Sequence, residues 1–500
     1  MTKIKTITIV GGGTSGWLTA AYLLKNLQEP VHITLIESSK IGVIGVGEGT
    51  QPYTSTFLRK CGFEPHQWMK PADATYKYGV EFIGWTNQNY FVDNDSTRTH
   101  IVNKDNLLHH AWVGKDVSRY LSWLPAYRLA KNNISPKLDD KLDFVVGNSA
   151  TPAEAVHFNA IKIGESIKAL ILDKIEYHDA EVIGVNTDQY GVSSLILSNR
   201  ILNYSSDFYI DCTGFKSLLI EGALKQQHIS INNLLPCDSA VAMPTQYINP
   251  EKECHPYTKA TAMDCGWRWT IPTYSRIGNG YVYSSKYISS SDAEAELRKS
   301  INEYEAKAIH LKMRCGFKSS IAVGNVLAVG LSAGFVEPLE ATGITFTTKV
   351  VETFCNLLNN FENNYDTNTK LTINRFFITM VEEIVNFIFL HYKNSTKRDT
   401  SFWQDIDKIP VNNKIKELES MFKPYPPSKL TQYGLFDMFH SGQWFQVLSS
   451  DGYYSKIQNS LTEQEEIYYK IHTEMLRLRT DLQIEHYPNH YNYLKKTYEI

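Results

Sequence analysis

The sequence lacks the features that mark membrane-spanning and nucleic-acid-binding proteins. None of its apolar runs approaches the roughly 20 residues needed to cross a bilayer. Its 50 Lys plus Arg nearly balance 53 Asp plus Glu, which gives a formal net charge of -3 and predicts no basic surface for nucleic acid or lipid. The residues after Met1 do not have the pattern of a secretory signal. We therefore expect a cytoplasmic protein with a small-molecule partner.

Cysteine is scarce and scattered, and the cysteines and histidines do not have the paired spacing of a zinc site. The seven cysteines are an odd number, which fits buried thiols in a reducing compartment, and we predict no metal. Hydrophobic residues, in contrast, make up 43% of the 500 residues, enough for more than one core. Aromatic residues make up 12%, which leaves rings for a pocket that binds a flat ligand.

The N-terminal region has the pattern of a dinucleotide-binding βαβ unit. A β-branched run at 4–10 leads into a glycine turn at 11–16, after which apolar residues recur at helical spacing. A second apolar run ends at Glu37, 21 residues after Gly16. In such a unit the glycines let the backbone approach a pyrophosphate at the helix N-terminus, and the acid binds ribose hydroxyls. The complete pattern is much more specific than the glycine motif alone.

Later segments favour FAD as the dinucleotide. Strand-like runs end in glycine at 208–214 and at 326–330, which suggests that distant segments wrap one dinucleotide. The loop at 41–52 (IGVIGVGEGTQP) has four glycines and could lie against a flat ring. A second fingerprint, for NAD(P)H, does not accompany the βαβ unit, so we expect a separate flavin reductase as partner.

Several motifs resemble, in the same order, those of the flavin-dependent halogenases of the tryptophan halogenase family. The main ones are GGGTSGW (11–17), IGVGEGTQP (44–52), GWRWTIP (266–272) and GFVEPLEATGI (334–344). GWRWTIP resembles the signature that separates these halogenases from general flavin monooxygenases. The shorter stretches VHFNA (156–160) and DCTGF (211–215) support the resemblance, which covers about the first 400 residues.

The resemblance implies a reaction and the residues that carry it. Reduced FAD, O2 and a halide ion would give hypohalous acid, which a lysine would deliver to an aromatic substrate for electrophilic substitution. Lys77 matches this lysine, and Glu340 matches a glutamate that orients the lysine or accepts the ring proton. Thr342 and Gly343 match the pair that binds the halide at a helix N-terminus.

One position departs from the family pattern at this point. The residue after the glutamate is usually serine, and here it is Ala341. The substitution removes a hydroxyl group that would help to hold Glu340. Since bromide and iodide are softer and easier to oxidise than chloride, we expect one of them to be preferred.

The predicted binding residues form two sets. For FAD they are Gly11, Gly13, Thr14, Ser15, Gly16, Glu37, Gly45, Val46, Gly47, Glu48, Gly49, Asp211 and Gly330. For the substrate pocket and its surroundings they are His110, Trp112, Trp267, Trp269, Tyr433 and Trp444. Trp267 and Trp269 match the two signature tryptophans, which line or shield the space between flavin and tunnel in the family.

The C-terminal part resembles the family less closely. Members that act on free tryptophan hold its amine and carboxylate with a block rich in tyrosine and glutamate and with a Phe-Trp-Asn cluster. The corresponding stretch, LTQYGLFDMFHSGQWFQVLSSDG (430–452), is shorter and has no convincing copy of that cluster. A pocket without these groups should be less specific. We therefore expect free tryptophan to be a poor substrate and electron-rich indoles or phenols to be accepted.

The fold expected from these motifs is α/β, with a Rossmann-type FAD-binding domain like that of flavin monooxygenases interleaved with a largely helical substrate-binding domain. The predicted FAD-binding module comprises 1–90, 155–220 and 320–365. The predicted substrate-binding module comprises 91–154, 221–319 and 366–500.

A periodic apolar stripe near the C-terminus predicts a long amphipathic helix. Its members are Ile467, Ile471, Met475, Leu478 and Leu482, and the helix should end ahead of Pro488. Ser460 and Glu463 have the spacing of a capping box at its start. We expect the stripe to pack into the core.

Two other functions are compatible with an FAD-binding fold. A flavin-dependent monooxygenase would hydroxylate or epoxidise its substrate without halide, and GWRWTIP together with Lys77 argues against it. A non-catalytic FAD-binding protein would have no need of Lys77 and Glu340, and both are present.

Overall fold

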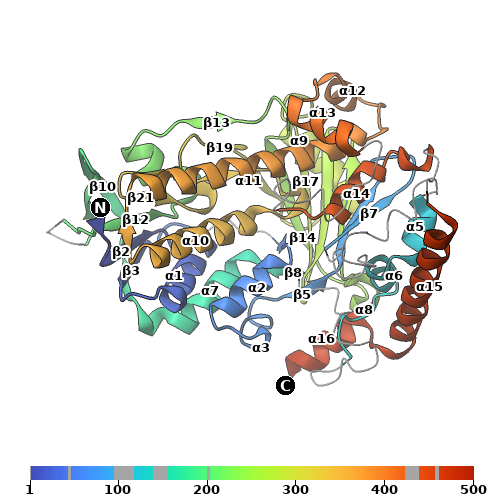
Figure 1. Ribbon diagram of the computed structural model, residues 1–500, viewed down its shortest axis with the longest axis horizontal. Helices are drawn as coiled ribbons and strands as arrows, with labels where there is room; N and C mark the ends of the chain where they lie inside the picture. The colour runs from blue at the N-terminus through green and yellow to red at the C-terminus, as the bar shows by residue number, and fades with distance from the viewer. Residues whose placement is uncertain are drawn as a thin grey trace. The chain divides into compact units, whose positions relative to one another are not determined.

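The computed structural model describes residues 2–42, 47–94, 117–138, 155–199, 203–422, 438–456 and 461–499 (Figure 1). The chain forms two compact units, each assembled from three stretches of sequence. Unit 1 comprises Met1–Ala74, Phe158–Asn232 and Met313–Glu382. Unit 2 comprises Thr75–His157, Asn233–Lys312 and Glu383–Ile500.

Unit 1 is built on a six-stranded sheet with the order β20-β21-β12-β2-β3-β9. Strands β21, β12, β2, β3 and β9 run parallel, and β2 aligns Val10 with Ile36 of β3 and with Asp211 of β12. The central strands β12, β2 and β3 are largely buried because helices cover a parallel sheet, which explains their nearly continuous apolar sequences. The sequence-based strand, turn and helix pattern is confirmed.

Helix α1 packs against both α7 and α10 (Figure 1). The elements of unit 1 are β1 Thr2–Lys3, β2 Thr6–Val10, α1 Thr14–Asn26, β3 His32–Glu37, β4 Gly47–Gly49, α2 Tyr53–Lys60, α3 Pro65–Trp68, α7 Ala160–Ile171, β9 Glu176–Asp179, β10 Val182–Asp188, β11 Gly191–Leu197, β12 Phe208–Asp211, β13 His228–Ser230, β19 Gly316–Lys318, β20 Ala322–Val323, β21 Val326–Ala328, β22 Gly334–Phe335, α10 Gly343–Asn360 and β23 Asn364–Tyr365. A short π-helix, Leu218–Ala223, follows β12. Helix α11, Thr367–Asn394, supplies residues to both units.

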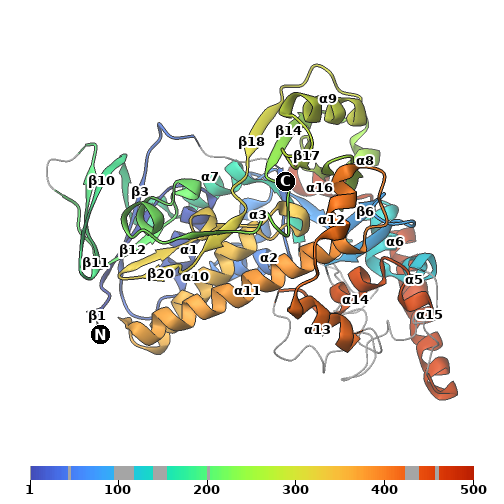
Figure 2. The same ribbon diagram turned by 90° about the horizontal axis from the view of Figure 1, so that it is seen from above.

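Unit 2 contains a seven-stranded sheet with the order β18-β14-β17-β16-β15-β6-β7. Its elements are β5 Thr75–Lys77, β6 Gly79–Ile83, β7 Tyr90–Asp93, α5 Val117–Trp123, α6 Pro125–Lys131, β8 Ala155–Asn159, β14 Ser239–Thr245, α8 Pro250–Glu253, β15 Thr258–Met263, β16 Gly266–Pro272, β17 Ile277–Tyr283, α9 Ser290–Ile301, β18 Ile309–Lys312, α12 Ser401–Lys408, α13 Asn413–Phe422, α14 Ser441–Ser449, α15 Glu463–His486 and α16 His490–Glu499. Helix α9 covers β14, β17 and β18 (Figure 2).

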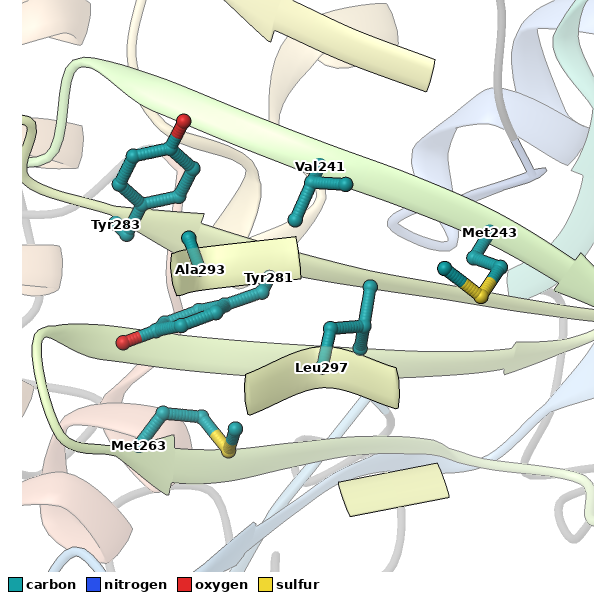
Figure 3. Close-up of a cluster of buried hydrophobic side chains, with 7 residues drawn as sticks. All are labelled: Val241, Met243, Met263, Tyr281, Tyr283, Ala293 and Leu297. Carbon is teal, nitrogen blue, oxygen red and sulfur yellow. The ribbon is translucent and has the colours of Figure 1, made fainter. Parts of the chain in front are cut away.

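The core between α9 and this sheet is apolar and aromatic (Figure 3). Ala293 and Leu297 of α9 meet Val241, Tyr281 and other side chains of the sheet, and both are fully buried. Because side chains alternate between the faces of a strand, residues 267 and 269 of β16 lie on the other face of the sheet, away from this core. That alternation places the two signature tryptophans together on the face that α9 leaves uncovered.

The prediction for the C-terminal helix is right about the helix and wrong about its packing. Helix α15 ends at His486, but its capping box joins Thr462 and Glu465 in place of the expected pair. The stripe that we expected in the core is exposed, with fractions from 44% at Leu482 to 58% at Met475. The buried positions are Tyr469, Thr480 and Gln483.

The apolar stripe is exposed because α15 packs through another side against its neighbouring helices. It contacts α5 and α6, and Arg128 of α6 forms an ion pair with Asp481 and donates to the carbonyl of Arg477 at 3.1 Å. The side of α15 that these contacts cover is largely polar, and the apolar stripe stays exposed. Periodicity alone identifies an apolar face but does not determine which face the neighbouring helices cover.

Among the described residues, helices long and apolar enough to cross a membrane are absent. Clusters of three or more His, Cys, Asp or Glu side chains that could hold a metal ion are also absent from that part of the chain.

Candidate active site

The glycine turn between β2 and α1 is too tight for side chains. Gly11 has φ +112°, and a Cβ added there would lie 2.3 Å from the carbonyl oxygen of Cys212. A Cβ on Gly16 would lie 1.9 Å from the carbonyl oxygen of Gly11. Gly13 is the N-cap of α1 and provides no side-chain cap, so the first amides of the helix are left for a ligand. This turn therefore fits a dinucleotide pyrophosphate.

Glu37 lies at the end of β3, directly beside the turn. Its Oε1 accepts hydrogen bonds from Lys168 Nζ at 2.5 Å and from Tyr177 OH at 2.9 Å. A Cβ on Gly12 would lie 1.5 Å from Glu37 Oε2, so the carboxylate packs directly against the backbone of Gly12. This arrangement holds an acid where a ribose would follow a pyrophosphate.

Asp211 supports the turn from the neighbouring strand β12. Its Oδ1 accepts from the amide and hydroxyl of Thr213 and from the hydroxyl of Ser332, at 2.7–3.1 Å. Its Oδ2 accepts from the amides of Leu219 and Ile220, at 2.8 and 2.9 Å, and so caps the π-helix. Since the side chain is fully buried and accepts five bonds, its contribution to the site is to fix the surrounding loops.

Gly330 brings the segment after β21 against the glycine turn. It has φ +68°, and a Cβ there would lie 2.2 Å from Ser15 Oγ. Ser15 Oγ in turn lies 3.0 Å from Thr347 Oγ1 on α10. Thr14 anchors the other side, because its hydroxyl donates to the carbonyl of Ala160 at 2.7 Å. The structure thus brings together three predicted FAD-binding residues from distant parts of unit 1.

The glycine loop at 41–52 is described only in part, because Gly45 and Val46 lie outside the described residues. Gly47–Gly49 form β4, and burial raises the pKa of Glu48 to about 7. Just beyond the strand, Gln51 Nε2 donates to the carbonyl oxygen of Glu340 at 2.7 Å. The loop motif and the EPLEATG motif, which are far apart in sequence, therefore meet in unit 1.

The segment around Glu340 ends in the N-terminus of α10. Glu340 and Thr342 are fully buried, and Ala341 between them is left-handed, with φ +55°. Thr342 is the N-cap of this 18-residue helix, but its hydroxyl makes no capping bond and has no partner among the described residues. A Cβ added to Gly343 would meet nothing within 4 Å. A buried hydroxyl, open space and unpaired helix amides suit a small anion.

Lys77 ends the short strand β5 of unit 2 and is fully buried. The strand pairs antiparallel with β8, which places Ala155 opposite Lys77 and His157 opposite Thr75. Thr75 and Lys77 point to the same face, so His157 is the diagonal neighbour of Lys77, within reach of a long side chain. The small Ala155 leaves room for the lysine side chain.

His157 ties the lysine strand to the rest of unit 2. Thr75 Oγ1 donates to the carbonyl of Pro272 at 2.7 Å and lies 3.2 Å from His157 Nδ1, while Nε2 lies 2.9 Å from Thr258 Oγ1. Because the Thr75 proton is already used, Nδ1 must donate and Nε2 must accept. Burial, together with the nearby charge of Lys77, lowers the pKa of His157 well below its ordinary value. His157 is therefore a neutral ring that links β5 to the end of the GWRWTIP strand.

The two signature tryptophans lie side by side on β16. Trp267 and Trp269 are buried, with ring centroids 6.3 Å apart and planes at 61°. Gly280 on β17 makes room for them, because a Cβ there would lie 1.9 Å from the ring of Trp269. Both rings come from one strand and one face, so they form a continuous aromatic surface.

The comparison with known proteins settles which family these motifs indicate. A sequence profile of the family described as "Tryptophan halogenase" matches residues 6–466. The chain belongs to the tryptophan halogenase family. It is 30% identical to the 7-chloro-L-tryptophan 6-halogenase KtzR of Kutzneria sp. (strain 744), over 98% of this chain and 99% of KtzR. It is 31% identical to the tryptophan 6-halogenase SttH of Streptomyces toxytricini, over 84% of each chain.

Solved halogenase structures share the fold over nearly the whole chain. The SttH crystal structure superposes with a TM-score of 0.88 at 28% identity, covering 99% of this chain and all of that one. BrvH, a flavin-dependent halogenase from Brevundimonas sp. BAL3, gives a TM-score of 0.85 at 26% identity and covers 99% of both chains. The predicted α/β fold with its FAD-binding Rossmann-type domain is confirmed.

This halogenase is therefore an enzyme of known cofactor chemistry. Flavin-dependent halogenases use FADH2, O2 and a halide ion, and they work with a separate flavin reductase on aromatic substrates. The residues of unit 1 fit the flavin dinucleotide, because the backbone at Gly11, Gly16 and Gly330 forms a cradle that a Cβ would fill.

The substrate side of the halogenase is described less completely. His110, Trp112 and Tyr433 lie outside the described residues. Trp444, on α14, is fully buried, and its ring meets that of Phe387 edge-on at 4.9 Å. Lys77 belongs to unit 2 and Glu340 to unit 1.

Sequence reasoning missed several residues that the halogenase fold places at these positions. His157 lies in the VHFNA motif, but a lone histidine in an apolar strand gives no signal of the hydrogen bonds that it makes across the sheet. Gln51 lies in the quoted loop motif, and its contact with Glu340 depends on a partner 289 residues away. Thr347, the partner of Ser15, lies within a helix whose sequence has no distinguishing pattern.

Proposed function

We propose that this halogenase delivers an oxidised halogen from Lys77 to an electron-rich aromatic compound of the indole or phenol type. The observation that carries this proposal is the complete burial of Lys77 on β5, opposite Ala155 and diagonal to the neutral His157. A lysine ammonium is rarely buried to this degree without a function. A buried lysine side chain, shielded from water, can hold hypohalous acid by a hydrogen bond. As a neutral amine it can instead react with the acid to form a haloamine and water.

Glu340 is the proposed second catalytic residue. Its carboxylate is fully buried, and Gln51 anchors its backbone, which supports a fixed position for a group that accepts the ring proton. Thr342 and Gly343 are the proposed halide site. The hydroxyl of Thr342, the open space at Gly343 and the N-terminus of α10 support this assignment. Reduced FAD, when bound, would react with O2 and so supply the oxidising chemistry.

The same proposal gives each of the two units a role. The FAD-binding residues of the turn, Glu37, Asp211 and Gly330 all belong to unit 1, which we propose as the flavin-binding part. Lys77, Trp267, Trp269 and Trp444 belong to unit 2, which we propose as the substrate-binding part.

We also propose that reduced FAD comes from a separate NAD(P)H-dependent reductase. Whether the reductase binds the halogenase would be tested by separating the two proteins with a membrane that passes only FAD.

The substrate is proposed to be an indole or phenol and not strictly free tryptophan. The support is the short C-terminal stretch 430–452, of which the described part places Trp444 in a packed aromatic contact. SttH is a tryptophan 6-halogenase and KtzR a 7-chloro-L-tryptophan 6-halogenase, so tryptophan is the competing substrate. Relative turnover of tryptophan, indole and phenol, with FAD, a reductase and one halide, tests the proposal. A clear preference for tryptophan would refute it.

Bromide or iodide is the proposed halide. The support is Ala341, whose methyl group provides no hydroxyl beside Glu340 and whose left-handed backbone fixes the turn into Thr342. Fewer hydrogen-bond donors favour the halides that are less strongly hydrated. Competition between the three halides for one substrate measures the preference, and a preference for chloride would remove this proposal.

A further inference from the structure

Asn94 is placed directly against the backbone of Lys77. It follows the last residue of β7, and its amide donates to the carbonyl of Tyr78 at 2.9 Å, which continues the β6–β7 ladder by one residue. Its side chain then reaches one residue further, where Nδ2 donates to the carbonyl oxygen of Lys77 at 3.4 Å. Because a carbonyl oxygen can only accept, the bond fixes which side-chain atom is nitrogen and which is oxygen.

The other end of the Asn94 amide is buried and unused. Asn94 is only 4% exposed, and its Oδ1 has no hydrogen-bond partner among the described residues. Buried acceptors are nearly always satisfied, because an unpaired one loses its bonds to water and gains nothing. An acceptor that the fold orients, buries and leaves unpaired beside the proposed catalytic lysine is prepared for a donor on a ligand.

The two neighbouring glutamine amides do not offer a free acceptor as Asn94 does. One residue earlier, the amide of Asp93 donates to Gln446 Oε1 at 3.0 Å, and Gln446 Nε2 donates to Tyr120 OH at 3.0 Å. Gln446 is therefore bonded at both ends. Gln443, one helical turn before it on α14, has an unpaired Nε2 among the described residues and is 1% exposed. Nε2 is a donor, so it cannot replace Asn94 as an acceptor.

We propose that Asn94 Oδ1 accepts a hydrogen bond from an N–H or O–H group on the aromatic ring of the substrate and thereby determines substrate specificity. This inference rests on the proposed function and defines its substrate class as arenes with a ring-bound donor, such as indoles and phenols. An arene without a donor would leave the buried oxygen unpaired and bind more weakly. A hydrogen bond accepted from the donor also moves electron density into the ring, which favours electrophilic attack.

Equilibrium binding of three ligands to the FAD-loaded protein tests this inference without any halogenation. Indole has the donor, benzofuran replaces the N–H with oxygen at no added bulk, and 1-methylindole replaces it with a methyl group. Titration calorimetry should show indole binding about tenfold more tightly than benzofuran, which corresponds to about 1.4 kcal/mol. Asn94→Leu should lose this preference and bind indole and benzofuran with about equal affinity. In the matched control Gln443→Leu, which removes a buried amide whose oxygen already accepts from the amide of His440, the preference should stay at about tenfold.

The outcomes separate this inference from its alternatives. If Asn94 acts only by holding the backbone of Lys77, Asn94→Leu will weaken all three ligands equally and keep the indole preference, which overturns the inference. Equal affinities of the wild type for the three ligands, or no binding of any of them, also overturn it, and this comparison needs no folded variant. If the wild type prefers indole but never halogenates it, the proposed function fails while the role of Asn94 stands.

Discussion

The buried carboxylate of Asp211 should be essential for the folding of unit 1. The change Asp211→Asn keeps the shape and burial of the side chain but converts one oxygen into an NH2 group. If that group faces the π-helix, it opposes the amides of Leu219 and Ile220, which now donate to Oδ2 at 2.8 and 2.9 Å. If it turns the other way, it opposes the amide of Thr213. Either orientation therefore breaks bonds that the carboxylate makes.

The magnitude follows from the number of broken bonds. A hydrogen bond to a charged group contributes about 1.5–3 kcal/mol, and the variant loses one or two of them, depending on the orientation of its amide, which gives about 1.5–6 kcal/mol. This is a large part of the 5–15 kcal/mol that typically stabilises a folded protein. Asp211→Asn should accordingly unfold at a much lower urea concentration and bind FAD weakly, because the loops that meet the glycine turn are no longer fixed.

Urea unfolding followed by far-UV circular dichroism, with FAD titration in parallel, measures both effects. Asp399→Asn is the control, since Asp399 is an exposed carboxylate that pairs with Lys397 and should contribute less than about 1 kcal/mol. If Asp211→Asn is destabilised no more than this control, the reasoning from the five hydrogen bonds is wrong.

Three further predictions concern the glycine turn, the signature tryptophans and a buried histidine. Gly11→Ala should cost about 1–3 kcal/mol through its left-handed backbone and should abolish FAD binding in a fluorescence titration, whereas Gly42→Ala, where a Cβ meets nothing, should bind FAD normally. Gly280→Ala should displace the Trp269 ring and lower the halogenation rate at least about tenfold with FAD binding kept, and an unchanged rate would contradict the packing described here. Burial lowers the pKa of His490 to about 4, so its unfolded form takes up a proton first as the pH falls below about 6.5, and stability is lost between pH 6.5 and 4. Between pH 7 and 4.5 the wild type should lose about 2 kcal/mol more than His490→Gln in urea unfolding, and equal losses would show that His490 does not titrate as inferred.

The parts of the fold that depend on local pattern could be predicted from the sequence. The β2 strand, the glycine turn and Glu37 all follow from short-range periodicity and spacing, and the structure has them where they were expected. Lys77 could not be identified in this way, because it is one of many lysines and only the family motif singles it out.

The parts that depend on distant partners could not be predicted. The bond from Ser332 to Asp211 spans 121 residues. The partners of His490 are Tyr76 and Cys254, which no local pattern relates to it. The exposed stripe of α15 shows the same limit. Its period gives an apolar face, but the neighbouring helices α5 and α6 pack against α15 and leave that face exposed.

The most direct test of the central proposal is the halogenation activity of Lys77→Ala. The variant and the wild type would be incubated with FAD, a flavin reductase, NAD(P)H, O2, bromide and indole, and the products analysed by mass spectrometry, with FAD affinity measured in parallel. If Lys77 delivers the halogen, the variant will give no brominated product above a control without enzyme, while its FAD affinity stays within about twofold of the wild type, because the proposed flavin-binding residues all lie in unit 1. Brominated product from Lys77→Ala at a rate close to that of the wild type would contradict the proposal.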